Sequence, residues 1–274
     1  MPKKTADRIF PPFARVPFYY AALSSLFLYY KVDRARVEPH LEGTGLKPAL
    51  MDGKAVVNID FQRYLSSGNS YLERTVEVEF NIVSYPASRE PGVPKLSLKD
   101  FLAGQDLTKT IGNYRLHVAA DDEMAVKAGK KFYGEAKFYA TFEYEVPDLN
   151  SPDTTTWQFT CNDDEKNPIF SVQADISMLP ALASNMSPLV DFSMLTIDKG
   201  KKTKLDESWR NLLGFFQTFY PDRRSTITLK YGGSQKRMRY DMEKIIGSSP
   251  CVGVQLFQSS PVCIESRAFY VNPR

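Results

Sequence analysis

Two segments in which apolar and polar residues alternate constrain the fold of this 274-residue chain more than any other feature. The first covers residues 68–85, and a repeat of two places successive side chains of a β-strand on opposite faces. The apolar face carries Leu72, Val76, Val78, Phe80 and Ile82. The polar face carries Glu73, Thr75, Glu77, Glu79 and Asn81. We therefore predict a half-buried strand with Glu77 and Glu79 on a solvated face.

The second segment, residues 112–146, is predicted to form two strands joined by a turn. Alternation resumes at Tyr133 and places a single lysine, Lys137, on the polar face of the second strand. That face also carries Glu135, Tyr139, Thr141, Glu143 and Glu145.

Lys137 has two interpretations that the alternation does not separate. In the first, the polar face is solvated and Lys137 is an ordinary surface lysine, since lysine is rarely buried. In the second, the face lines a pocket, where loss of hydration lowers the pKa of the amine and makes it a nucleophile toward carbonyl groups.

The rest of the chain predicts many short strands and few helices, which is a mainly β (α+β) class in a single domain over residues 1–274. A proline-rich loop and a helix capped by Ser97 form a predicted insertion at 86–106, which either covers a pocket or makes an oligomer contact.

Spacings of three and four from Leu205 predict a long amphipathic helix up to Pro221. Other helices are predicted at 35–41, with Asp33 as N-cap, and at 241–249. Further strands are predicted at 18–31, 55–61, 157–161, 169–177, 225–231, 252–257 and 262–271.

Composition excludes several functional classes. A net charge of +3 without a basic run that contains aromatics gives no support to nucleic-acid binding. Two histidines and no carboxylate cluster with ligand spacing predict no metal, and no cofactor is expected. The apolar run 18–30 is about 13 residues long, short of the roughly 20 that a membrane helix needs. Three cysteines without a CxxC pair favour a reducing compartment, so we expect a cytoplasmic protein that does not bind membranes.

The residues around Lys137 resemble a known family. Gly129, Gly134, Ala136 and Lys137 match a pattern G-[RK]-x-x-x-G-x-[PA]-K, and the preceding residues contain the acidic turn D-x-E-x-A at 121–125. This pattern is similar to the core of the acetoacetate decarboxylase family, where its lysine forms a Schiff base. The resemblance implies a closed antiparallel β-barrel with a few flanking helices, and we expect a homo-oligomer.

The resemblance also implies roles for several residues. Lys137 would be the Schiff-base lysine, and Glu73, in a Y-x-E motif, would be the second catalytic residue and transfer protons. Asn58, Glu135 and Tyr139 are the predicted substrate-binding residues. Glu135 is expected to oppose activation of Lys137 because its charge favours the ammonium form.

The chain departs from the family at three positions. Phe138 replaces the second lysine that follows the nucleophile, Leu23 lies where the carboxylate-binding arginine is expected, and Asn58 lies where a further glutamate is expected. Without the second lysine, burial beside aromatics such as Tyr133 and Tyr139 would have to lower the pKa of Lys137.

Two functional hypotheses follow. The first is a lyase in which Lys137 forms a Schiff base with a small oxo acid or oxo ester, diverged from decarboxylation toward aldolase or dehydratase chemistry. The second is a catalytically silent barrel that binds an apolar or planar small molecule among its 15 tyrosines and 18 phenylalanines.

Overall fold

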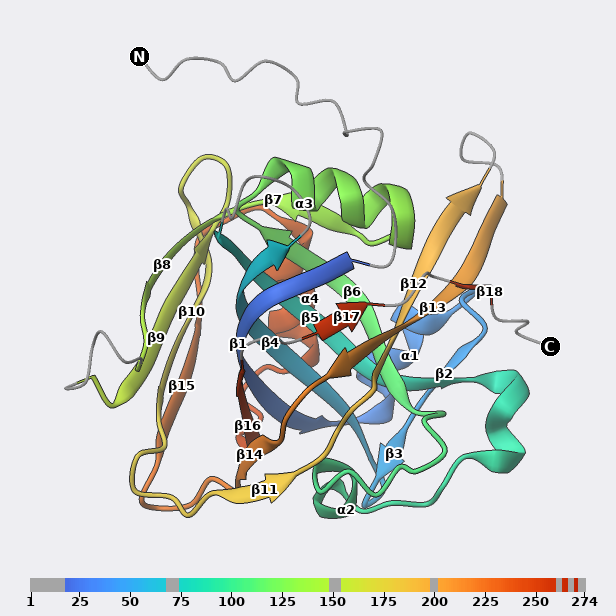
Figure 1. Ribbon diagram of the computed structural model, residues 1–274, viewed down its shortest axis with the longest axis horizontal. Helices are drawn as coiled ribbons and strands as arrows, with labels where there is room; N and C mark the ends of the chain where they lie inside the picture. The colour runs from blue at the N-terminus through green and yellow to red at the C-terminus, as the bar shows by residue number, and fades with distance from the viewer. Residues whose placement is uncertain are drawn as a thin grey trace.

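The computed structural model describes residues 18–67, 74–147, 154–197, 202–259, 263–265 and 269–270 (Figure 1). These ranges form a large β-sheet, a small β-sheet and a few short helices. The prediction of a mainly β chain is confirmed.

The large sheet contains fourteen strands within the described ranges. They are β1 (Phe18–Val32), β2 (Leu46–Pro48), β3 (Leu50–Met51), β4 (Lys54–Ser67), β5 (Arg74–Pro86), β6 (Gly112–Ala120), β7 (Lys137–Tyr139), β11 (Leu182–Ser184), β12 (Leu189–Ile197), β13 (Lys202–Leu212), β14 (Phe216–Phe219), β16 (Cys251–Ser259), β17 (Cys263–Glu265) and β18 (Phe269–Tyr270). The strands β1, β4, β5 and β6 lie side by side as antiparallel neighbours and form the centre of the sheet.

The strand pairing does not support the closed antiparallel barrel. The main path runs β11-β14-β16-β1-β17-β13-β12-β6-β5-β4-β3, β1 also pairs with β4, and β2, β7 and β18 join the path at the side. The strand β6 pairs in parallel with both β12 and β7. One edge of β1 is divided between β16 and the three residues of β17, so the sheet splits there. A closed antiparallel barrel would instead carry uninterrupted antiparallel pairing around a ring.

The small sheet packs against the large one through an apolar core. Its strands, in spatial order, are β15 (Thr226–Tyr231), β10 (Pro168–Asp175), β9 (Thr156–Asn162) and β8 (Thr141–Glu145), and Figure 1 shows them beside the large sheet. The ring of Phe61 on β4 stacks on Phe159 of β9, with 4.4 Å between centroids. Trp157 meets Phe61 edge-on and is buried.

The helices are short. They are α1 (Arg34–Leu41), the 3₁₀ helix η1 (Ala87–Gly92), α2 (Leu98–Leu102), α3 (Glu123–Ala128), the π-helical turn η2 (Gly129–Tyr133) and α4 (Arg237–Ile245). The predicted helices near 35–41 and 97–104 are confirmed, and Ser97 and Asp100 form the expected capping box on α2. A helix is also found near the predicted 241–249, but α4 begins four residues earlier, at Arg237, and ends at Ile245. Asp33 precedes α1 but does not cap it, because its carboxylate pairs with Lys54. Among the described helices, none has the length and apolar character needed to cross a membrane.

The long helix predicted from Leu205 is wrong. Residues 205–212 belong to β13, and residues 216–219 form β14. The apolar spacing was misleading because β13 buries polar side chains: Asp206, Ser208 and Arg210 are all shielded from solvent. A strand whose inward face is charged loses the alternation by which strands are identified.

The predicted turn within 112–146 is also wrong. The helices α3 and η2 connect β6 to β7, and the two strands pair in parallel, which requires a crossover connection. The alternation from Tyr133 is interrupted at Ala140, where β7 ends before β8 begins.

Both faces of β5 are buried, contrary to the prediction of a solvated polar face. Glu77 is 4% exposed and Glu79 is 1% exposed. The opposite face, with Val76, Val78 and Phe80, belongs to the core between the two sheets. The two glutamates point instead into a buried polar cluster of the large sheet.

Candidate active site

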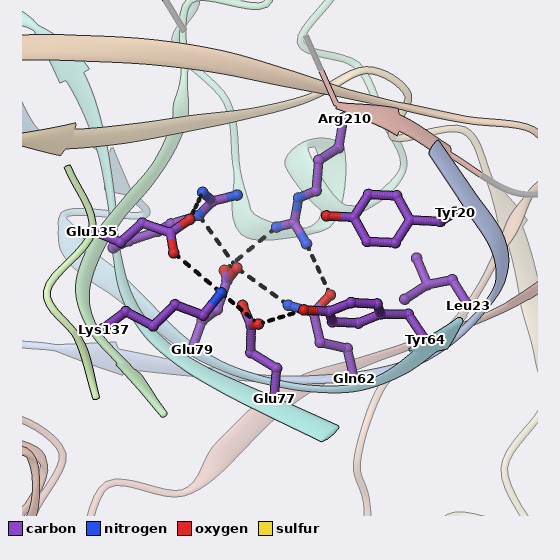
Figure 2. Close-up of a pocket in the computed structure, with 10 residues that line it drawn as sticks. Tyr20, Leu23, Gln62, Tyr64, Glu77, Glu79, Glu135, Lys137 and Arg210 are labelled. Atoms are coloured by element: carbon purple, nitrogen blue, oxygen red, sulfur yellow. Dashed lines mark hydrogen bonds and ion pairs between the residues drawn. The ribbon is translucent and has the colours of Figure 1, made fainter. Parts of the chain in front are cut away.

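A small cavity lies beside Lys137 on the polar side of β4 and β5. Its volume is about 20 Å³, which is enough for about one water molecule. It is lined by Tyr20, Leu23, Gln62, Tyr64, Glu77, Glu79, Arg115, Glu135, Lys137 and Arg210, and we call this set the lysine pocket. Figure 2 shows Tyr20, Leu23 and Tyr64 on the side of the pocket opposite Lys137 and Glu135.

The local structure of the motif explains how Lys137 enters the pocket. Gly134 ends η2 with φ of 67°, a left-handed conformation that glycine adopts without strain. Gly129 has ordinary helical geometry, but a Cβ atom there would lie 2.1 Å from Glu135 Oε2 and 2.6 Å from Lys137 Cδ. The two glycines therefore let the helical connection turn back and pack directly over Glu135 and Lys137.

Lys137 is 6% exposed, and its ammonium group lies between two carboxylates. Its Nζ is 2.6 Å from Glu77 Oε2 and 3.2 Å from Glu135 Oε2. Burial lowers the pKa of Lys137, but the charges of Glu135 and Glu77 outweigh burial and raise the pKa above its ordinary value. The depressed pKa expected for a pocket lysine is therefore not found, and Glu135 opposes activation as predicted.

Glu77 is the carboxyl group closest to the lysine. Burial raises the pKa of Glu77 to about 7, against the opposing charge of Lys137. Tyr64 donates its hydroxyl hydrogen to Glu77 Oε2 over 3.0 Å. A carboxyl group that titrates near neutral pH next to an amine is suited to move protons to and from that amine.

Two buried arginines form the rear of the pocket. Arg115 on β6 binds Asp191 at 2.8 Å, Glu79 at 3.2 Å and Glu135. Arg210 on β13 binds Asp191 at 2.8 Å, Asp60 at 3.3 Å and Glu79 at 3.4 Å. Burial would raise the pKa of Glu79, but the charges of Arg210 and Arg115 lower it to about 2.

The structure brings only some of the predicted site residues together. Glu135 contacts Lys137 within the pocket. Asn58 is buried behind it and accepts a hydrogen bond from Asn81, which also donates to Glu79. Tyr139 is 41% exposed and does not line the pocket. Glu73 lies outside the described residues.

Sequence reasoning missed Glu77, Arg115 and Arg210. Glu77 was assigned to solvent because the polar face of a strand is usually wet, and Arg210 was assigned to a helix. A signal was present in residues 58–62 of β4, where Asn58, Asp60 and Gln62 alternate with apolar residues as the glutamates of β5 do. Adjacent strands with matching polar faces favour a shared buried network when both are central in a sheet.

The lining is largely polar, which does not favour the hypothesis of an apolar ligand at this position. The apolar surface in the pocket comes from Leu23 and the rings of Tyr20 and Tyr64. In the described part of the chain, no group of three or more His, Cys, Asp or Glu residues is arranged to hold a metal ion.

Comparison with known proteins gives matches in structure alone. No protein-family model and no curated protein sequence matches the chain. The enduracididine biosynthesis enzyme MppR, complexed with pyruvate, superposes with a TM-score of 0.65 at 9% identity, covering 98% of this chain and 94% of its own. Acetoacetate decarboxylase from Legionella pneumophila superposes with a TM-score of 0.65 at 11% identity, covering 98% and 93%. An acetoacetate decarboxylase-like enzyme from Sphingomonas wittichii superposes with a TM-score of 0.63 at 14% identity, covering 93% of each chain.

These similarities extend over nearly the whole chain and over nearly the whole of each matched protein. At identities of 9 to 14% they show a shared fold. The resemblance read from the residues around Lys137 is thus confirmed at the level of fold.

Proposed function

We propose that this chain, with the fold of the acetoacetate decarboxylase-like enzymes, is a lyase that forms a Schiff base between Lys137 and a small carbonyl compound. The observation that carries the proposal is the position of Lys137: its amine is buried in a pocket and lies 2.6 Å from Glu77. The fold supports this reading, because the same fold in MppR holds pyruvate.

Glu77 has the properties needed for the proton transfers. It takes a proton from the Lys137 ammonium, and the neutral amine attacks the carbonyl carbon. A proton then passes from the nitrogen to the former carbonyl oxygen, which gives the carbinolamine. Glu77 then returns the proton to the carbinolamine hydroxyl, which leaves as water. We assign Glu77 this role on its contact with Lys137; a contribution from Glu73 stays a prediction.

The iminium accepts an electron pair when a bond to the neighbouring carbon breaks, so the site suits aldol cleavage, condensation or dehydration. The resemblance suggested an oxo acid or an oxo ester as the partner. MppR has also been solved with the condensation product of pyruvate and imidazole 4-carboxaldehyde, which is consistent with chemistry of this type.

The raised pKa of Lys137 has a kinetic consequence. The amine is almost entirely protonated at neutral pH, so the rate of Schiff-base formation should increase with pH until the amine is free. The cavity of about 20 Å³ is also smaller than such a substrate, so binding requires side chains such as Tyr20 and Tyr64 to move.

Reductive trapping of the Schiff base tests the proposal. The protein is incubated with pyruvate, methyl pyruvate or hydroxyacetone at several pH values, reduced with borohydride, and digested for mass spectrometry. We expect an adduct on Lys137 that increases from pH 7 to pH 10 and is absent in Lys137→Ala. Lys130→Ala, which removes an exposed lysine of the same segment, should keep it. Absence of an adduct with every compound would overturn the proposal.

A further inference from the structure

The cationic side chains of the lysine pocket are all engaged by carboxylates of the protein. Arg210 is surrounded by Asp191, Asp60 and Glu79. Arg115 reaches Asp191, Glu79 and Glu135, and Lys137 reaches Glu77 and Glu135. A substrate carboxylate would have to compete with one of these buried partners for its cation.

The pocket also contains more acids than bases. Among the described residues, three cations (Arg115, Lys137 and Arg210) face five carboxyl groups, those of Asp60, Glu77, Glu79, Glu135 and Asp191. Buried charges that are not balanced take up protons. Burial raises the pKa of Asp60 well above its ordinary value and that of Glu77 to about 7. The cluster thus already has an excess of acidic groups, and an added anion would increase that excess.

Among the described residues, the side of the pocket away from Lys137 provides no compensating cation. Tyr20, Leu23 and Tyr64 form it, as Figure 2 shows. A substrate group that lies there meets apolar surface and hydroxyl groups.

Schiff-base formation itself leaves a carboxylate in need of a donor. An ammonium group has three N–H bonds and an iminium nitrogen has one, while the reaction of ammonium and carbonyl to iminium and water leaves the charge unchanged. Lys137 now serves both Glu77 Oε2 and Glu135 Oε2, and Glu135 Oε2 makes no hydrogen bond besides this ion pair. One of the two oxygens therefore loses Lys137 as its donor when the iminium forms. Glu77 Oε2 would keep the Tyr64 hydroxyl, whereas Glu135 Oε2 has no other donor among the described residues.

We propose that the lysine pocket selects a small carbonyl compound that has no carboxylate and that carries a hydroxyl or ammonium group next to the carbonyl, that is, a hydroxy- or amino-ketone or aldehyde. The substrate donor binds the carboxylate oxygen that the iminium releases, and Glu135 is the specificity residue. This inference rests on the Schiff base of the proposed function, and it narrows the substrate to uncharged or cationic carbonyl compounds.

A panel of matched probes tests the selection. Hydroxyacetone, aminoacetone, butanone, pyruvate and methyl pyruvate are trapped with borohydride under identical conditions. The rate of Lys137 labelling for each is divided by the rate for a free lysine derivative, which removes the intrinsic reactivity of the carbonyl. We expect hydroxyacetone and aminoacetone to exceed pyruvate by at least tenfold, with butanone and methyl pyruvate between them.

A single substitution tests whether Glu135 is the residue that selects the substrate. Glu135→Gln should reduce the preference for hydroxyacetone over pyruvate by about tenfold, whereas Glu143→Gln, an exposed glutamate on β8, should leave it unchanged. If Glu135→Gln does not fold, the wild-type panel decides alone.

The outcomes separate the two proposals. If no probe labels Lys137, the Schiff-base function fails and the substrate class fails with it. If Lys137 is labelled but pyruvate equals or exceeds hydroxyacetone after normalisation, the Schiff base stands and the selection is overturned.

Discussion

The two faces of β4 and β5 are equally buried and are built from opposite chemistry. On one face, Phe61, Val78 and Phe80 belong to the core shared with the small sheet. On the other, Asp60, Glu77 and Glu79 belong to an ion-pair network around Arg115, Lys137 and Arg210. Burial of the apolar face stabilises the fold directly, whereas burial of the charged face costs hydration energy that the ion pairs must offset.

The difference shows what each face is for. An apolar face would suffice to pack a sheet, and replacing a buried ion-pair network with apolar residues is often neutral or stabilising. A network of eight charged side chains in the middle of a sheet is therefore better explained by the site it supports, with Lys137 at its edge.

The largest expected effect is on the charged face. Glu79→Ala removes one of the two carboxylates that Arg115 and Arg210 share, the other being Asp191. Removing one member of a buried ion-pair network costs about 3–5 kcal/mol of unfolding free energy. Urea denaturation at pH 7 measures this loss. The control, Glu143→Ala on exposed β8, should change stability by no more than about 0.5 kcal/mol. A loss below about 1 kcal/mol for Glu79→Ala would show that the network does not tie the strands together.

The next effect is a pH dependence from Glu77. Its pKa is raised from 4.5 to about 7 in the folded state, so the native protein binds a proton that the unfolded chain has lost between these values. Stability from this group is therefore lost as pH rises from about 4.5 to 7. Relative to wild type, Glu77→Gln should gain about 2–3 kcal/mol between pH 4.5 and 8. Denaturation curves at four pH values test this, and a flat difference would contradict the raised pKa.

A smaller effect is expected on the apolar face. Phe61→Leu removes the stacking of Phe61 on Phe159 and part of the buried area, at a cost of about 1–2 kcal/mol. Because the change lies on the other side of β4, the yield of the Lys137 adduct should stay within about twofold of wild type when the protein is folded. A large decrease in labelling would show that the two faces are coupled.

The smallest effect is expected at Tyr139. Its side chain is 41% exposed and outside the pocket, so Tyr139→Ala should change both stability and adduct yield little, within about 0.5 kcal/mol for stability. Trapping and thermal melting on the same preparation measure both. A marked loss of labelling would restore the substrate-binding role that the sequence suggested for this residue.

The sequence predicted many of the strands and the helices α1, α2 and α4, because these depend on local alternation and on caps such as Ser97. It did not predict the burial of Glu77 or the strand at Arg210. A hydrophobicity pattern separates the faces of a strand but does not say whether the polar face meets water or other charges. The partners of Glu77 and Arg210 are 60 and 150 residues away in sequence, respectively Lys137 and Asp60. Such pairings become visible only when the strands are assembled.

The strands β6 and β7, which pair in parallel, and their connection through α3 and η2 form one continuous segment, residues 112–139. Its fewer than thirty residues carry the amine of Lys137, the carboxylate of Glu135 and the guanidinium of Arg115. Glu77, by contrast, lies on a different strand, β5. Transplanting this segment into another protein of this fold would thus carry the proposed nucleophile without its proposed proton carrier, so the two residues can change independently of each other.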